Sequence, residues 1–280
     1  MQKPIWPLSK RTMMTLVAAS AIAAIVLGIF LWLECRGPIV EPPLARDVAI
    51  MISPHPDDES YALGQTIAHQ TLNGRRVISV LLTDGEGSAL IPRWIQSSGR
   101  DVNADGMIDK WDFASVRRSE FREAMRILGV EEIIFMGRAD SKGASGLEDT
   151  ELAAEEVEEL LRPLAEKYPG ALWLTTAGYA PNESDLGDHL AHPDHVETLP
   201  AVLAAARAGG GTVYTFKVYV YLLPEYNRRA PFRVRGSSEE LAMKREAIDA
   251  YSEIGILSTP ELFEAASTDP FEYMVPIPLQ

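Results

Sequence analysis

Five apolar runs, each followed by a segment with helical spacing, constrain the fold of this chain more than any other feature. Large apolar side chains dominate each run, which is typical of strands that are buried on both faces of a sheet. Alternating strands and helices predict an α/β fold, a Rossmann-like three-layer sandwich with a mostly parallel sheet. The predicted strands are 48–53, 76–83, 131–137, 171–178 and 212–223, and the predicted helices are 58–72, 114–128, 148–167, 193–207 and 238–252.

An uncharged apolar segment, residues 12–33, precedes the first predicted strand. A helix of about 20 apolar residues crosses a bilayer, so this segment is predicted to be a transmembrane anchor. Lys3, Lys10 and Arg11 precede it, and the positive-inside rule therefore puts residues 1–11 in the cytoplasm and the remaining chain on the extracytoplasmic side. A cleaved signal peptide is the alternative. It fits less well because the segment is longer than the usual apolar region and lacks an A-x-A-like site at its end.

The rest of the chain reads as one domain. Residues 34–46 contain three prolines and no apolar period, so we expect an extended linker before a domain over 47–280. The net charge of −14 disfavours binding to nucleic acid. The single cysteine, Cys35, excludes an intramolecular disulfide and a thiolate-rich metal site. A metal site in this domain would have to use histidine and carboxylate ligands.

Polar loops follow four of the predicted strands. Ligands bind beyond the carboxyl ends of parallel strands, so these loops should converge on one rim of the sheet. The first loop contains His55 and Asp58, three residues apart. The last contains His192 and His195 at the same spacing, which places both on one helix face. Together the two pairs offer enough nitrogen and carboxylate ligands for a catalytic zinc ion. The loops are SPHPDDE (53–59), TDGEG (83–87), GRADS (137–141) and the segment 176–195.

Each of the two histidine motifs alone also has a purely structural interpretation. Pro-Asp is common in turns, and aspartate is favourable at a helix N-cap. Both motifs, however, follow buried strands, and together they hold three of the five histidines, which favours a metal site. A bound metal would polarise a carbonyl oxygen and lower the pKa of water. The remaining acids and histidine would then be free to transfer protons.

The motifs and their order resemble the LmbE-like, or PIG-L, family of zinc-dependent N-acetylglucosamine deacetylases. The resemblance covers residues 47–223 and rests on SPHPDDE, VLLTDGEG, VRRSEFREAMRILGV, FMGRADS and HPDH. It implies a metal-dependent hydrolase that removes the N-acetyl group from an N-acetylglucosamine-type sugar or glycoconjugate, carried on a lipid or a glycan. Two alternatives stay open. One is a zinc amidase that acts on a non-sugar acyl amide, and the other is a non-catalytic, calcium-stabilised glycan-binding module.

The resemblance also implies roles for the residues of the two histidine motifs. His55, Asp58 and His195 match the ligands of the zinc ion, although another divalent metal could take its place. Asp57 matches the general base that takes a proton from the attacking water. His192 matches the residue that stabilises the tetrahedral intermediate or protonates the leaving amine.

Other matched positions concern the substrate. Arg117 and Asp140 match residues that hold sugar hydroxyls in members of the family; a helix-surface charge and a plain loop residue are the alternative interpretations. The chain departs from some members at Leu190, where a tyrosine would supply an oxyanion donor, so that donor is missing here. His189 is interpreted as a loop residue and His69 as a structural or exposed residue of the first helix.

The insertion 101–112, DVNADGMIDKWD, fits the twelve-residue calcium loop of EF-hands. Gly106 stands at position six, where the backbone turns sharply, and position twelve is aspartate instead of glutamate, which resembles dockerin-like modules. We expect a structural Ca2+ here, in agreement with an extracytoplasmic location. A polar surface loop is the alternative. The expected ligands are Asp101, Asn103, Asp105, Met107 through its carbonyl, Asp109 and Asp112.

Overall fold

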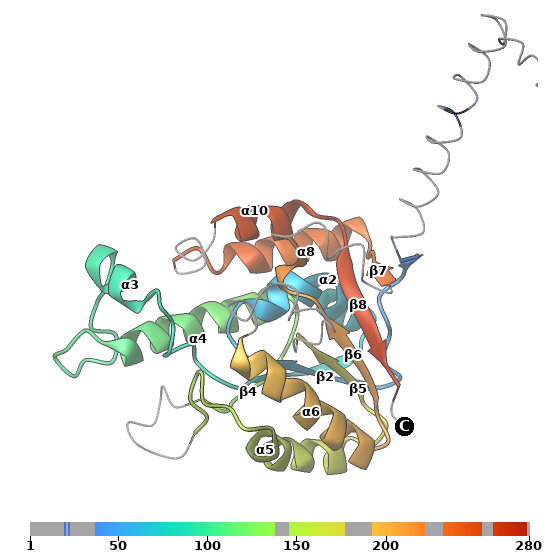
Figure 1. Cartoon of the computed structure of the whole chain (residues 1–280), viewed down its shortest axis with the longest axis horizontal. Helices are drawn as coiled ribbons and strands as arrows, with labels where there is room; N and C mark the ends of the chain where they lie inside the picture. The colour runs from blue at the N-terminus through green and yellow to red at the C-terminus, as the bar shows by residue number, and fades with distance from the viewer. Residues whose placement is uncertain are drawn as a thin grey trace, which may run out of the picture.

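The computed structural model describes residues 37–137, 146–176, 192–221, 232–253 and 260–278, together with positions 20 and 22. Within these residues eight strands form one sheet, and helices cover both of its faces (Figure 1). The elements in chain order are β1 (Ile39–Val40), β2 (Val48–Ser53), α2 (Asp58–Leu72), β3 (Arg76–Leu81), α3 (Ile91–Ser97), α4 (Lys110–Ile127), β4 (Glu132–Phe135), α5 (Ala154–Lys167), β5 (Leu172–Thr175), α6 (Pro193–Ala208), β6 (Thr212–Phe216), η2 (Tyr219–Tyr221), β7 (Phe232–Val234), α8 (Ser238–Asp249), α10 (Pro260–Thr268) and β8 (Glu272–Ile277).

Five neighbouring strands run parallel in the order β4-β3-β2-β5-β6. The chain moves from β2 outward to β4 on one side and then continues with β5 on the other side of β2. Strands β2 and β5 therefore flank a switch point of the topology, where parallel α/β sheets bind their ligands. The expected mostly parallel α/β sheet is confirmed. Its strand order brings together the loops that follow β2 and β5.

The side chains of β2 show that the sheet is buried on both faces. Ala49 and Met51 belong to one apolar cluster with residues of α2, whereas Ile50 and Ile52 belong to another with residues of α5 and α6. Successive residues of a strand point to opposite faces, so a strand between two helical layers is apolar at nearly every position. Helices α2, α8 and α10 lie above the sheet in Figure 1, and α5 and α6 lie below it.

The last strands of the sheet differ from the expectation. The run 212–223 forms β6 only as far as Phe216, and its later residues enter the 3-10 helix η2. Strand β8 then pairs antiparallel with β6 and β7. Ile39 and Val40, within the expected linker, pair with β7 as strand β1. Strand β8 contains Pro276 and β1 has two residues, so tertiary pairing defines both strands more than local sequence does.

Helix boundaries also differ at two places. Helix α4 begins at Lys110, before the predicted start at 114, because the Asp109 carboxylate accepts from the amides of Trp111 and Asp112 and caps the helix. Helix α5 begins at Ala154, six residues after the predicted start at 148. Neither α3 nor α10 is among the predicted helices.

The predicted anchor, residues 12–33, lies outside the described residues except for positions 20 and 22. Among the helices that the structure describes, none is both long enough and apolar enough to cross a bilayer. The anchor, and the extracytoplasmic orientation that depends on it, stay predictions from the sequence.

A buried ion pair joins α2 and α8 to β8. Helix α2 kinks at Leu63, whose φ of −144° and ψ of 22° are not helical. Just beyond the kink, the amides of Gln65 and Thr66 donate to the Glu272 carboxylate at 2.6 and 3.1 Å. The Lys244 ammonium lies 3.4 Å from the same carboxylate, and both side chains are fully buried. Burial raises the pKa of Glu272 and lowers the pKa of Lys244, so each charged form depends on the other.

Replacing Lys244 with methionine should destabilise the fold, because the Glu272 carboxylate would stay buried without its cation. Breaking a buried ion pair from one side costs about 3–5 kcal/mol of unfolding free energy. Urea unfolding followed by circular dichroism measures the loss. Lys167→Met, at an exposed position of α5, is the matched control. A loss below about 1 kcal/mol, as for an exposed pair, would contradict the structural role of Lys244.

Candidate metal centre

The two histidine motifs stand at helix N-termini on either side of the switch point. Strand β2 ends at Ser53 and α2 begins at Asp58, so His55 lies in the connecting turn. On the other side, His192 is the N-cap of α6, which puts His195 in the first turn of that helix. The short turn after β2 and the N-termini of α2 and α6 fix the directions of these side chains.

Three side-chain atoms of these motifs lie close to one another. His55 Nδ1 is 3.2 Å from Asp58 Oδ2 and 3.2 Å from His195 Nε2, and His195 Nε2 is 3.0 Å from Asp58 Oδ2. Zinc bonds of about 2.0 Å at tetrahedral angles separate neighbouring ligand atoms by about 3.3 Å. This spacing therefore fits a single divalent ion. The two facing ring nitrogens support the same interpretation, because they repel each other unless a proton or a cation lies between them.

Burial and charge keep Asp58 in the form that binds a cation. Burial raises the pKa of its carboxyl, but His195 and His55 outweigh this effect and lower the pKa below its ordinary value. Asp58 is therefore ionised at neutral pH. The structure brings together the three residues for which the sequence predicts a ligand role.

Asp57 lies beside these three residues in a strained backbone conformation. Its φ of 96° is in the left-handed region, which costs a residue with a Cβ about 1–3 kcal/mol. Two contacts hold the turn in place. The Asp57 amide donates to Glu59 Oε2 at 3.1 Å, and Arg117 Nη2 lies 2.9 Å from Asp57 Oδ2.

The environment of Asp57 strengthens it as a base. Burial raises the pKa of its carboxyl, and the Arg117 guanidinium opposes this shift without cancelling it. Arg117 is only 7% exposed, so its interpretation as a helix-surface charge is wrong. Burial lowers the pKa of Arg117, but Asp57 and Glu120 outweigh burial and raise it above its ordinary value. The guanidinium therefore stays charged beside the Asp57 carboxylate.

Two carboxylates that the sequence analysis did not single out face the opposite edge of the His55 ring. His55 Nε2 is 3.2 Å from Asp194 Oδ2 and 3.4 Å from Asp149 Oδ1. Burial lowers the pKa of His55, but Asp149, Asp194 and Asp58 raise it well above its ordinary value. A carboxylate that accepts from the second ring nitrogen of a metal-binding histidine fixes the tautomer that leaves the other nitrogen free for the metal.

Of the acidic residues near the site that were not predicted, Asp194 and Glu59 lie within the two histidine motifs, whereas Asp149 does not. Asp194 stands inside HPDH and Glu59 ends HPDDE, so a closer reading of the motifs could have found both. Glu59 is fully buried, and burial raises its pKa to about 7 against the opposing hydrogen bonds from Tyr251 and Ser60. Asp149 comes from the segment before α5, and no local pattern marks it.

His192 is the most exposed of the three motif histidines, with a side chain that is 30% exposed. Its Nε2 is 3.6 Å from Asp149 Oδ1, and its ring centroid is 4.2 Å from that of His55. Burial and the neighbouring His55 and His195 lower the pKa of His192. The imidazole is therefore neutral at neutral pH, and its Nδ1 accepts from the Asp194 amide at 3.4 Å.

Other predicted residues lie elsewhere. Asp140, His189 and Leu190 lie outside the described residues. His69 lies on α2, where its Nδ1 is 2.7 Å from Glu240 Oε1 on α8, so its role is structural.

The carboxylates of the insertion 101–112 bind the backbone of their own loop. Asp101 accepts from the Gly106 amide at 2.8 Å, and Asp109 and Asp112 form the capping box of α4. No three carboxylates of this loop, which is described throughout, lie close enough to one another to share an ion. The arrangement therefore gives no support to the expected calcium site, because helix capping already occupies two of its predicted ligands.

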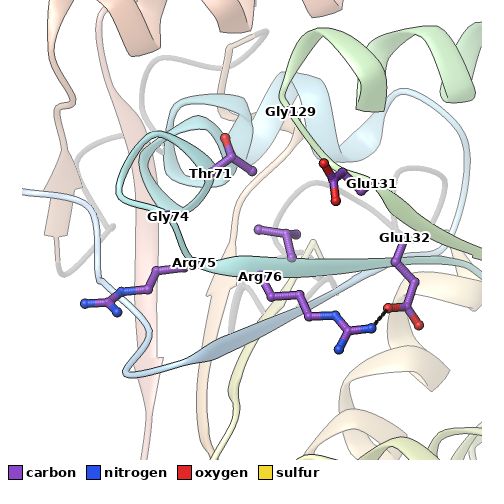
Figure 2. A pocket seen from close by; sticks show the side chains of 8 residues that line it. Thr71, Gly74, Arg75, Arg76, Gly129, Glu131 and Glu132 are labelled. Carbon is purple, nitrogen blue, oxygen red and sulfur yellow. Dashed lines mark hydrogen bonds and ion pairs between the residues drawn. The ribbon is translucent and has the colours of Figure 1, made fainter.

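A separate hollow opens at the amino ends of β3 and β4, at the opposite end of the strands from His55 (Figure 2). Two of its four charged lining residues, Arg76 and Glu132, pair with each other. None of the eight lining residues is a histidine or a predicted site residue. The predicted histidine and carboxylate ligands therefore lie at the carboxyl ends of the strands, away from this hollow.

Comparison with known proteins agrees with this geometry. Residues 50–206 match the family described as PIG-L: GlcNAc-PI de-N-acetylase. The 1D-myo-inositol 2-acetamido-2-deoxy-alpha-D-glucopyranoside deacetylase of Mycobacterium leprae is 32% identical over 174 residues, which cover 60% of this chain and 53% of the relative. The protein of the same name from Saccharomonospora viridis is 29% identical over 231 residues, which cover 73% of this chain and 80% of the relative. The chain thus spans about half the length of the first of these relatives.

Solved structures share the fold at lower identity. N,N'-diacetylchitobiose deacetylase from Pyrococcus horikoshii superposes with a TM-score of 0.51 at 21% identity, over 83% of this chain and 84% of the other. The zinc-inhibited form of teicoplanin deacetylase Orf2 gives a TM-score of 0.55 at 19% identity, over 82% and 98%. At such identities the likeness shows the fold alone. The sequence match over more than half of the chain shows the family: this chain belongs to the PIG-L family.

Proposed function

We propose that the chain is a metal-dependent N-deacetylase, with zinc as the expected metal, that hydrolyses the acetamide of an N-acetylglucosamine-type sugar or glycoconjugate. The meeting of His55 Nδ1, Asp58 Oδ2 and His195 Nε2 beside a buried acid is the observation that carries the proposal. The named relatives are deacetylases of an acetamido sugar joined to inositol, and a structural neighbour is a deacetylase of diacetylchitobiose. These names support an acetamido sugar as the substrate class.

Two histidines and one carboxylate would hold the metal, a ligand set that suits zinc and also other borderline divalent ions. When bound, the metal polarises the acetyl carbonyl and makes water more acidic. The protein positions its proton-transfer groups on either side of this ligand set.

Asp57 is the group that we assign to take the proton of the attacking water. Arg117 binds its Oδ2 and so fixes the direction of the carboxylate, while burial keeps its pKa above the ordinary value. A base is most effective when its pKa lies closer to the working pH. The strained turn at Asp57 is the local cost of this orientation.

His192 is the group that we assign to the departing amine. It is the most exposed of the three motif histidines, and its neutral ring can receive a proton and pass it on. The acetyl carbon gains the water oxygen, its bond to nitrogen breaks, and the amine leaves with a proton. Acetate and the free amino sugar are the products.

Replacing His195 with glutamine should remove the metal, because one of the three ligand atoms is lost. Elemental analysis after dialysis should show about one zinc ion fewer per chain, and acetate release should fall to background. His69→Gln, at the histidine that pairs with Glu240, is the matched control and should keep both. Full metal content in His195→Gln would contradict the proposed ligand set.

Asp57→Asn should abolish acetate release and leave the metal in place, because the amide keeps the shape of the carboxylate but cannot accept the proton. General-base catalysis contributes about 10²–10⁴-fold, so kcat should fall by that factor.

The assay compares N-acetylglucosamine conjugates with simple N-acetyl amines. Unchanged kcat in the variant would rule out the base role, and hydrolysis of only the simple amines would rule out the sugar.

Arg117→Gln should move the acidic limb of the kcat/KM profile to higher pH. Protonated Asp57 cannot act as the base, so activity falls as the pH drops through its pKa. The guanidinium lowers this pKa, and its loss should shift the limb upward by about one pH unit or more. Arg122→Gln, at an exposed arginine of the same helix, should leave the profile in place. A limb that stays in place or moves downward in Arg117→Gln would contradict the assigned pair.

A further inference from the structure

We propose that a second divalent-cation site lies beside the first, with Asp149, His192 and Asp194 as its ligands, and that an ion bound there inhibits hydrolysis by holding His192. The inhibitory effect rests on the proposed function, since it presumes that His192 acts in the reaction. The binding of the ion does not.

The potential ligand atoms of this second set surround a common space. Asp149 Oδ1 is 3.6 Å from His192 Nε2, whereas Asp194 Oδ2 is 3.9 Å from the other ring nitrogen, Nδ1, and His192 would offer only one of these nitrogens to an ion. One ligand atom each from these three residues and from His55 lies within 4.8 Å of all the others. Divalent ions bind such atoms at about 2.0–2.6 Å, so this spread suits one ion with water completing its ligands.

Asp149 Oδ1 distinguishes this set from a network of satisfied hydrogen bonds. Its carboxylate is held by the Gly87 amide, which donates to Oδ2 at 3.0 Å. The other oxygen, Oδ1, is enclosed and makes no hydrogen bond within the described part of the chain, and the side chain is only 4% exposed. A buried carboxylate oxygen without a donor is costly, and it lies toward the rings of His55 and His192. A cation at this place would remove the cost.

The distribution of charge in the crevice also favours a second cation. At the first site, Asp57 is paired with Arg117, and Asp58 would face the metal. Asp149 and Asp194 instead share a single ring nitrogen of His55. The amides of two backbone residues donate to Asp194, but they carry no formal charge. Two close carboxylates around one imidazole attract a divalent cation.

Access and ligand type indicate which ion would bind. Both carboxylates are buried, whereas His192 is 30% exposed and opens the set to solvent. One imidazole with two carboxylates suits zinc and similar transition ions better than magnesium or calcium. Asp194 already accepts two backbone hydrogen bonds, so the second ion should bind more weakly than the first. A ring nitrogen of His192 that is bonded to an ion can no longer exchange a proton with the substrate.

Zinc binding to the full chain tests the site without reference to activity. Equilibrium dialysis in chelator-buffered Zn2+, followed by elemental analysis, should give two ions per chain, one of them weaker. Asp149→Asn should lose at least about tenfold in affinity for the second ion, because one ligand is removed. It should also bind the first ion more weakly, because Asp149 faces the second ring nitrogen of His55. Glu151→Gln, at an exposed acid of the same segment, should keep both ions. His195→Gln should lose the first ion and keep the second.

Rates of acetate release test the inhibition. The rate of each variant is divided by its own rate at one equivalent of zinc. The zinc concentration that halves this relative rate should be at least about tenfold lower for the unmodified chain than for Asp149→Asn. Only one ion per chain at saturation, or a second ion that Asp149→Asn retains unchanged, would overturn the second site. Two ions without inhibition would overturn its inhibitory role. Failure of the proposed function gives a different result, with no acetate at any zinc concentration while the second ion still depends on Asp149.

Discussion

The placement of β3 and β5 on opposite sides of β2 is the constraint on which the site depends. Because β2 pairs with both strands, the loops that follow β2 and β5 leave the same edge of the sheet side by side. His55 and His195, 140 residues apart in the chain, thereby meet at 3.2 Å. Helices α2 and α6 begin at these loops, and their packing on opposite faces of the sheet fixes the direction from which each motif enters the crevice.

Within the crevice, His55 links two sets of acidic groups. Its Nδ1 faces Asp58 and its Nε2 faces Asp149 and Asp194, so one ring that is 13% exposed lies between three carboxylates. Such a concentration of negative charge opposes folding unless positive groups balance it. A bound cation would supply that balance and would stabilise the native state by mass action. The proposed metal would therefore contribute to the stability of the fold as well as to the reaction.

Apolar runs and helical spacing in the sequence predict those strands and helices whose own residues determine their structure. The apolar run of β2 and the helical spacing of α2 match the structure, and the convergence of HPDDE and HPDH follows from strand order. Strand β8 was missed because antiparallel pairing, not its own sequence, defines it. Asp149 and the pairing of Arg117 with Asp57 were missed because both depend on contacts between distant segments. The calcium site expected over 101–112 stays without support, since the pattern of Asp, Asn and Gly in that segment also serves turns and helix caps.

Anomalous diffraction from crystals of the chain grown with one equivalent of zinc would show whether His55, Asp58 and His195 hold a metal. Data collected above and below the zinc absorption edge locate the ion without reference to any assay. The account predicts one strong peak in contact with His55 Nδ1, Asp58 Oδ2 and His195 Nε2, with Asp57 beside it. Zinc bound only elsewhere, with these three atoms joined by a proton in place of a metal, would contradict it.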